Sequence, residues 1–141
     1  MNIVLTDAPD AGDVDVISAG LDAFNVDSTG INDRRPLAVL VRDPDTNEVV
    51  GGLVGRTSLG LLFVDTLYLP AELRGSGMGS EILRQAEDEA RKRGCHTGLL
   101  YTMNIHAPGF YQRNGWHAFG EVHSGGDHAG FYRVFMTKTL Q

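Results

Sequence analysis

Apolar residues recur every three or four positions in two parts of the chain, and this spacing predicts helices with one buried face. The first part spans residues 13–24, with apolar residues at Val14, Ile17, Leu21 and Phe24. The second spans residues 77–93, and its solvent-facing side is expected to carry Glu81, Arg84, Glu87, Asp88, Arg91 and Lys92. A short third helix is expected over residues 107–114, because Pro108 suits a first turn and Gly115 follows the last one.

Short runs of apolar and β-branched residues between turn signals predict the strands. These runs cover residues 2–6, 36–42, 48–56, 61–69, 95–103, 116–122 and 131–140. The polar stretch 25–33 is expected to be a loop with room for a short further helix, and the glycine-rich stretch 123–130 a flexible loop. The order β-α-(α)-β-β-β-α-β-α-β-β predicts one α/β domain over residues 1–141, with a mixed (α+β-type) sheet. A parallel strand–helix–strand unit would form its centre, with antiparallel hairpins outside.

A glycine-rich turn separates the strand at 61–69 from the long helix, and it has the sequence Arg74-Gly75-Ser76-Gly77-Met78-Gly79. Alternate glycines let the backbone bend sharply and approach a ligand closely. The free N–H groups at the start of a helix, with the positive end of its dipole, favour an anion such as a phosphate. A Walker loop is excluded because no lysine follows the glycines. A dinucleotide fingerprint would need glycine in place of Ser80 and a repeated βαβ pattern. A turn that merely reverses the chain remains an alternative.

Two stretches of the chain resemble the GNAT superfamily of N-acetyltransferases. The glycine turn matches that family's acetyl-CoA signature, [RQ]-x-x-G-x-[GA], and the residues LYLP at 67–70 precede it as expected. Residues 103–116, MNIHAPGFYQRNGW, resemble the second signature, N-x-x-A-x-x-F/L-Y-x-x-x-G-F/W. One predicted helix and one predicted strand separate them, and the resemblance extends over about residues 49–140. It implies a mixed sheet splayed into a V.

The resemblance also implies where acetyl-CoA binds and which groups act on it. The implied cofactor-binding residues are Leu67, Tyr68, Leu69, Arg74, Gly75, Ser76, Gly77, Met78, Gly79, Asn104 and Tyr111. Within this set, the backbone of Leu67 and Leu69 would hold the pantetheine arm, and Asn104 would hydrogen-bond to it. Arg74 is either a charge partner of the cofactor or a residue that stabilises the turn. Tyr111 is the candidate general acid, because a phenol with a pKa near ~10 can return a proton to a thiolate.

The base and the acceptor site are expected on other segments. Asp65 is the candidate general base, expected to share its side-chain face with Leu67 and Leu69, and His106 is a rival candidate. By resemblance, the acceptor would contact the end of the first helix and the loop at 123–130. The candidate acceptor contacts are Phe24, Asn25 and Asp27, with Asp33 a further acidic candidate.

Composition narrows the class of protein. The net charge of −6 argues against nucleic acid as a partner and favours a cationic acceptor, although it also serves solubility alone. No apolar run approaches the ~20 residues of a membrane span, and the N-terminus does not resemble a signal peptide. The single cysteine, Cys95, agrees with a cytoplasmic protein and is expected to be a small buried residue. The histidine spacing matches no zinc template, so no metal is expected.

Together these features predict an acetyl-CoA-dependent N-acetyltransferase. It would move an acetyl group directly to a primary amine, within a ternary complex, on a small molecule or a protein. The alternative is a GNAT-fold module that binds acyl-CoA without catalysis, as a sensor or an interaction subunit. A homodimer is expected from the habit of the family and from the apolar stretch 131–136, which would lie near a sheet edge.

Overall fold

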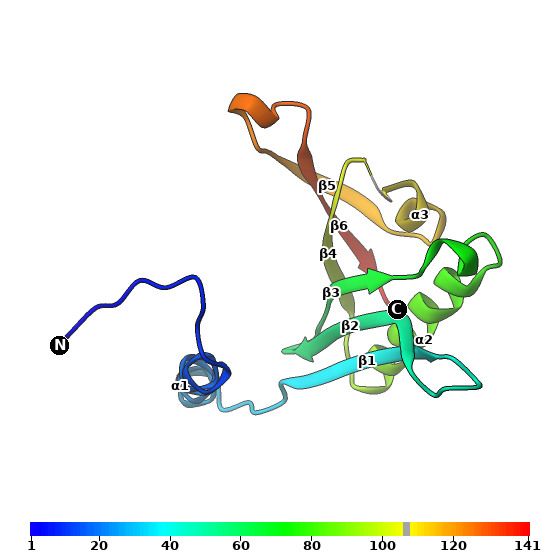
Figure 1. Cartoon of the computed structure of the whole chain (residues 1–141). Helices are drawn as coiled ribbons and strands as arrows, with labels where there is room; N and C mark the ends of the chain where they lie inside the picture. Colours follow the sequence, from blue (N-terminus) through cyan, green and yellow to red (C-terminus); the bar gives the residue numbers. More distant parts are fainter. Residues whose placement is uncertain (106–107) are drawn as a thin grey trace. The chain divides into compact units, whose positions relative to one another are not determined.

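The computed structural model of the chain describes residues 1–105 and 108–141, and these fall into two compact units, Met1–Arg34 and Arg35–Gln141 (Figure 1). The first unit contains one helix, α1 (Ala11–Thr29). Among its described residues, the second contains a six-stranded sheet, two α-helices and two short 3₁₀ helices. Its elements are β1 (Arg35–Arg42), β2 (Val49–Ser58), β3 (Leu61–Tyr68), α2 (Met78–Lys92), β4 (Thr97–Met103), α3 (Pro108–Arg113), β5 (His117–His123) and β6 (Tyr132–Thr139). The order across the sheet is β1-β2-β3-β4-β6-β5.

Helix α1 confirms the predicted first helix but is longer than expected. It continues through Thr29 and ends at Gly30, whose φ of 73° is left-handed and whose N–H donates to the Val26 carbonyl. Most of the predicted loop at 25–33 is therefore helical. The predicted strand at residues 2–6 is wrong. Residues 1–34 are all described and contain no strand to pair with it, and an extended segment needs a paired neighbour to be stable.

Strands β1, β2 and β3 form the predicted antiparallel meander. Two glycines of β2 are needed where neighbouring backbones come close. A Cβ at Gly52 would lie 2.2 Å from the Val39 carbonyl oxygen, and one at Gly55 would lie 2.1 Å from that of Phe63. No larger residue fits between these strands without moving them.

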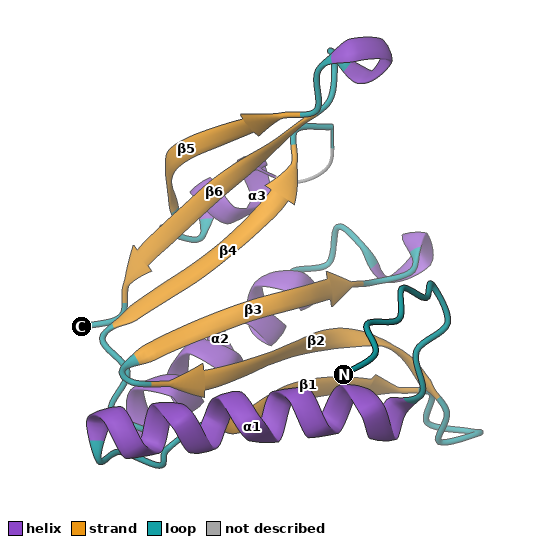
Figure 2. Cartoon of the chain, turned by 90° about the vertical axis from the view of Figure 1, so that its left-hand side faces the viewer, coloured by secondary structure: helices purple, strands orange, loops and turns teal. Residues whose placement is uncertain are grey.

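The centre of the sheet is parallel and then opens, as the resemblance implied. Strand β3 pairs with β4 over three positions only, the last of them Phe63 with Leu99. Just beyond, Asp65 is an extra residue in β3, because Val64 pairs with Gly55 and Thr66 with Val54. Such a bulge bends its strand. The carboxyl ends of β3 and β4 diverge from this point (Figure 2).

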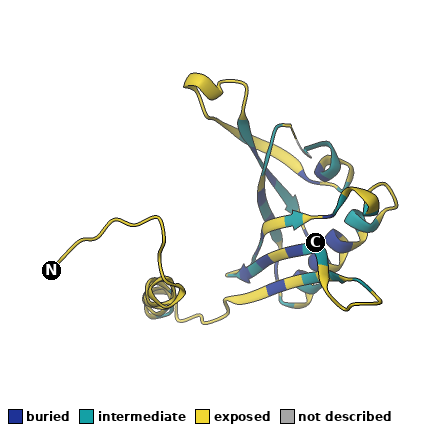
Figure 3. Cartoon of the chain, in the orientation of Figure 1, coloured by how far each residue is buried: buried dark blue, intermediate teal, exposed yellow. Residues whose placement is uncertain are grey.

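Helices α2 and α3 cover the same face of this sheet (Figure 1). The core lies between them and the strands (Figure 3), and α2 contributes Ile82, Leu83, Ala86 and Ala90 to it. The Trp116 indole lies against Gly98 of β4, where an added Cβ would come within 2.4 Å of the ring. Cys95 is buried, as expected of a packing residue.

One residue of α2 differs from the pattern that the sequence indicated. Glu87 was expected on the solvent-facing side of α2, but only 3% of its surface is exposed. Strand β6 lies one position in from the edge of the sheet, between β4 and β5. Among the residues described, no helix is long and apolar enough to cross a bilayer.

Candidate functional site

The glycine turn follows the carboxyl end of β3, after a single 3₁₀ turn at Ala71–Leu73. Gly75 and Gly77 have φ of 81° and 85°, left-handed values that favour glycine. The Arg74 Nε donates to the Leu69 carbonyl oxygen at 2.8 Å, and its guanidinium lies 6.0 Å from the centre of the Tyr68 ring. Arg74 thus stabilises the turn. Its second predicted role, as a charge partner of the cofactor, stays a prediction.

Helix α2 begins directly at this turn, with Gly77 as its N-cap. The first intrahelical bond runs from the Glu81 N–H to the Gly77 carbonyl, at 3.1 Å. The N–H groups of Met78, Gly79 and Ser80 precede that bond, so they are the donors that a helix start offers to an anion. A Cβ at Gly79 would lie 3.2 Å from the Phe110 ring, so a glycine there lets α3 pack against the start of α2.

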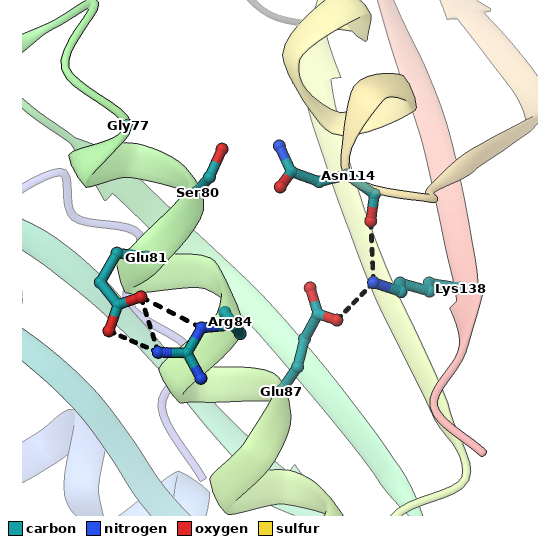
Figure 4. Close-up of a pocket in the computed structure, with 7 residues that line it drawn as sticks. All are labelled: Gly77, Ser80, Glu81, Arg84, Glu87, Asn114 and Lys138. Carbon is teal, nitrogen blue, oxygen red and sulfur yellow. Dashed lines mark hydrogen bonds and ion pairs between the residues drawn. The ribbon is translucent and has the colours of Figure 1, made fainter.

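A cavity of about 360 Å³ continues from the turn along α2 (Figure 4). It is lined by Gly77, Ser80, Glu81, Arg84, Glu87, Asn114 and Lys138. Ser80 on α2 and Asn114 after α3 face one another across it (Figure 4). Glu81 and Arg84 pair with each other at 2.6 Å, and the hydrogen bond from Arg84 lowers the pKa of Glu81. A ligand anchored at the turn can therefore extend into this cavity.

Tyr111 is buried on α3, with 7% of its surface exposed. Its ring packs edge-on against Phe110 and Trp116, with centroid distances of 5.1 Å and 6.2 Å. Burial raises the pKa of the Tyr111 phenol above its usual value, because an anion is poorly solvated there. The group is therefore protonated at neutral pH and can act only as a proton donor or a neutral hydrogen-bonding group.

Asp65 lies on the other face of the sheet from the one that was predicted. Its carboxylate accepts a hydrogen bond from Arg56 Nη1 at 2.7 Å, and the Arg56 guanidinium stacks 4.3 Å from the centre of the Phe63 ring. Leu67 packs against the core and Leu69 is buried in it. The prediction that Asp65 shares their face is wrong, because the extra residue at the bulge shifts the alternation of β3.

The Asn104 side chain joins the end of β4 to the start of β6. Its Nδ2 donates to the Gly130 carbonyl oxygen and its Oδ1 accepts from the Tyr132 N–H, both at 3.1 Å. An amide carries two hydrogens, so this role leaves room for the predicted bond to pantetheine, which stays a prediction.

The other predicted residues stay predictions. Phe24, Asn25 and Asp27 lie within α1 rather than in a loop, and belong to the first unit. The rival base His106 lies outside the described residues. Within 1–105 and 108–141, no three histidine, cysteine or acidic side chains gather as they would around a metal ion.

Residues 15–116 match the model of the family described as Acetyltransferase (GNAT) family. The chain belongs to the GNAT acetyltransferase family.

Relatives within this family are acetyltransferases by name. Acetyltransferase Atu2258 of Agrobacterium fabrum is 42% identical over 122 residues, covering 86% of this chain and 88% of that protein. The blasticidin-S acetyltransferase of Streptomyces morookaense is 40% identical over 91 residues, covering 62% of this chain and 67% of that protein. The crystal structure of a protein from Agrobacterium tumefaciens classed as an acetyltransferase superposes with a TM-score of 0.85, at 39% identity over 99% of both chains. The expected GNAT fold is confirmed.

One buried group of this GNAT protein escaped the sequence analysis. Glu87 lines the cavity, and its carboxylate contacts Trp116 and Lys138. Its position follows Leu83 by four residues and precedes Ala90 by three, so it falls on the buried stripe of α2. That spacing was visible in the sequence, but a charged residue is rarely buried unless it is paired, and its partners are distant along the chain.

Proposed function

We propose that this protein is an acetyl-CoA-dependent N-acetyltransferase, acting as one domain over residues 1–141. It transfers the acetyl group directly to a primary amine while both substrates are bound. The observation that carries the proposal is that three features suited to this reaction lie on neighbouring elements. The free N–H groups at the start of α2, the divergence of β3 from β4 and the protonated Tyr111 belong to neighbouring elements, and Phe110 of α3 packs on Gly79 of α2.

The cofactor would follow the free backbone groups of these elements. The amides of Met78, Gly79 and Ser80 suit its pyrophosphate, and the cavity beside them suits its nucleotide end. Beyond Phe63, strand β3 no longer pairs with β4, so its backbone at Leu67 and Leu69 can bind the pantetheine arm as an added strand. An N–H of this strand would also hold the thioester oxygen as negative charge develops on it.

The reaction then needs two proton transfers. The neutral amine attacks the carbonyl carbon, the C–N bond forms, and the C–S bond of the tetrahedral adduct breaks. Tyr111 gives its proton to the departing thiolate. Asp65, half exposed and paired with Arg56, takes the proton of the attacking amine through water. The negatively charged protein, in the cytoplasm, would attract a cationic acceptor.

The acceptor is proposed to be a small amine. The support is the name of one relative, whose acceptor is the antibiotic blasticidin S. A panel of antibiotic amines, simple amines and a lysine peptide, each offered with acetyl-CoA, tests this class of substrate. Free CoA released with at least one small amine is the expected result. Tight CoA binding without release on any amine would favour the non-catalytic module.

Replacing Tyr111 with Phe tests the mechanism. The ring contacts with Phe110 and Trp116 are kept, and only the proton donor is lost. The single-turnover rate should fall by roughly 10²–10⁴-fold, the usual worth of general acid catalysis, with little change in CoA affinity. Tyr132→Phe, on β6, is the matched control. A wild-type rate in Tyr111→Phe would show that Tyr111 is only a packing residue.

A further inference from the structure

Glu87 is an acid buried in the middle of α2, and two groups from other parts of the structure and one from α2 itself meet it. Its Oε1 lies 2.5 Å from Lys138 Nζ of β6 and 3.7 Å from Arg91 Nη2. Its Oε2 accepts a hydrogen bond from the Trp116 indole N–H at 3.3 Å. Both carboxylate oxygens are therefore engaged, and both point away from α2 toward the segment that follows α3 (Figure 4).

Two partners of Glu87 connect it to the segment 111–116, which begins with Tyr111. Lys138 is hydrogen-bonded to this segment, and Trp116 is its last residue. Lys138 Nζ also donates to the Asn114 carbonyl oxygen at 2.8 Å (Figure 4). The Trp116 backbone N–H donates to the Tyr111 carbonyl oxygen at 2.9 Å, and the two rings pack edge to face. The Glu87 carboxylate is therefore connected to Tyr111 by two routes. One runs through Trp116, and the other runs through Lys138 and Asn114, whose N–H also donates to the Tyr111 carbonyl oxygen.

Stability alone does not account for this arrangement. Removing a carboxylate from water costs free energy, and its pairing with a lysine inside a protein commonly only offsets that cost. Apolar residues of similar size in place of such a buried ion pair often leave the free energy of unfolding unchanged or raise it. What the ion pair and the indole bond add is direction, because each requires a particular distance and angle between α2 and the end of α3.

We propose that Glu87 is a positioning residue for Tyr111. Through Trp116 and Lys138 it fixes the phenol relative to the start of α2, the element on which the cofactor would be anchored. The phenol is thereby held where the thiolate forms. This inference rests on the proposed function, in which Tyr111 is the acid.

A double-mutant cycle tests the proposal. Glu87→Gln keeps the volume of the side chain and an oxygen for the Trp116 N–H but removes the charge that faces Lys138. Its single-turnover rate should fall by roughly 10- to 100-fold, because small misplacements of a catalytic group cost about that much. In a Tyr111→Phe background the same change should cost less than about twofold, because no proton donor is left to misplace.

Two further readouts separate positioning from general damage. Trp116 is the single tryptophan, so its fluorescence reports directly on the indole, and a shifted emission is expected in Glu87→Gln. Because Glu87 also lines the cavity beside the turn, the single-turnover rate is measured at saturating acetyl-CoA, where a change in cofactor affinity no longer affects it. Glu89→Gln is the matched control. Glu89 lies on the same helix and pairs with Arg93 at 2.8 Å, so neither rate nor fluorescence should change.

Lys138→Gln approaches the same network from β6, and it serves if Glu87→Gln fails to fold. It should repeat the pattern: the single-turnover rate should fall strongly when Tyr111 is present and hardly at all in the Tyr111→Phe background. Equal losses in the two backgrounds would overturn the proposal and make Glu87 an ordinary structural residue. A wild-type rate in Tyr111→Phe alone would instead remove the proposed acid, and the positioning of Tyr111 would fall with it.

Discussion

The Tyr111 phenol links the stability of the protein to alkaline pH. Burial raises its pKa in the folded state, whereas the unfolded chain has the ordinary value near ~10. Above about pH 10 the unfolded state therefore loses this proton first. The contribution of the protonated phenol to the free energy of unfolding is fully present below that pH, and it is lost as the pH rises through the pKa of the folded state. In denaturant titrations between about pH 8 and 11, Tyr111→Phe should lose less stability than wild type. Parallel losses would contradict a buried, protonated phenol.

Single residues were predictable where their role depends on neighbours along the chain. The glycines at 75 and 77 occupy left-handed positions at a turn, and a local motif identifies such positions. Asp65 and Glu87 were misplaced for a different reason. A bulge is specified by the pairing of two strands, and a buried acid by cations elsewhere in the fold, such as Lys138. The bulge is not encoded in the local alternation of β3, and the spacing that places Glu87 on the buried stripe of α2 does not reveal the distant partners of its carboxylate.

The start of α2 provides a test at the scale of one element. A Cβ at Gly77 meets nothing within 4 Å, so Gly77→Val places its side chain in the open space before the helix. CoA affinity should fall at least about tenfold if the pyrophosphate occupies that space. Gly60→Val is the control, because Gly60 has a similar φ of 83° and equally open surroundings, but precedes β3. Calorimetry showing unchanged affinity in a folded Gly77→Val protein would refute the assignment.

Helices and strands were predicted well where buried apolar residues recur at a regular spacing and where turn residues mark the ends of the element. Helix α2 begins after Gly77 and ends at Lys92, within one residue of the predicted 77–93 at each end. All the strands of the second unit appear within a few residues of their predicted bounds. The segment 2–6 has the same alternation but no neighbour to pair with in its unit. Alternation alone predicts a strand only where the fold supplies a partner.

At the scale of the whole molecule, we expect a homodimer. Tyr101, Phe119 and Phe135 form a row of rings on the sheet, with centroid distances of 5.3 Å and 6.2 Å, and the first two are about 60% exposed. Such a patch beside an edge strand favours association. Light scattering should give twice the 15.3 kDa of one chain, and Phe119→Lys should lower that mass. A wild-type mass of 15.3 kDa at micromolar concentration would exclude the dimer.

The short parallel ladder between β3 and β4 makes the middle of the sheet incomplete. Beyond Phe63, the edge of β3 that faces β4 offers its backbone amides to water, and these should exchange their hydrogens for deuterium quickly. If acetyl-CoA lies there as an added strand, the exchange at Leu67 to Leu69 should slow when it binds. The β1–β3 meander and the β4–β6–β5 ladder would then open together rather than as separate cooperative units. The cosubstrate would thus serve for the duration of each turnover as a seventh strand of the sheet. The resistance of the sheet to local unfolding would rise with the fraction of the protein that has acetyl-CoA bound.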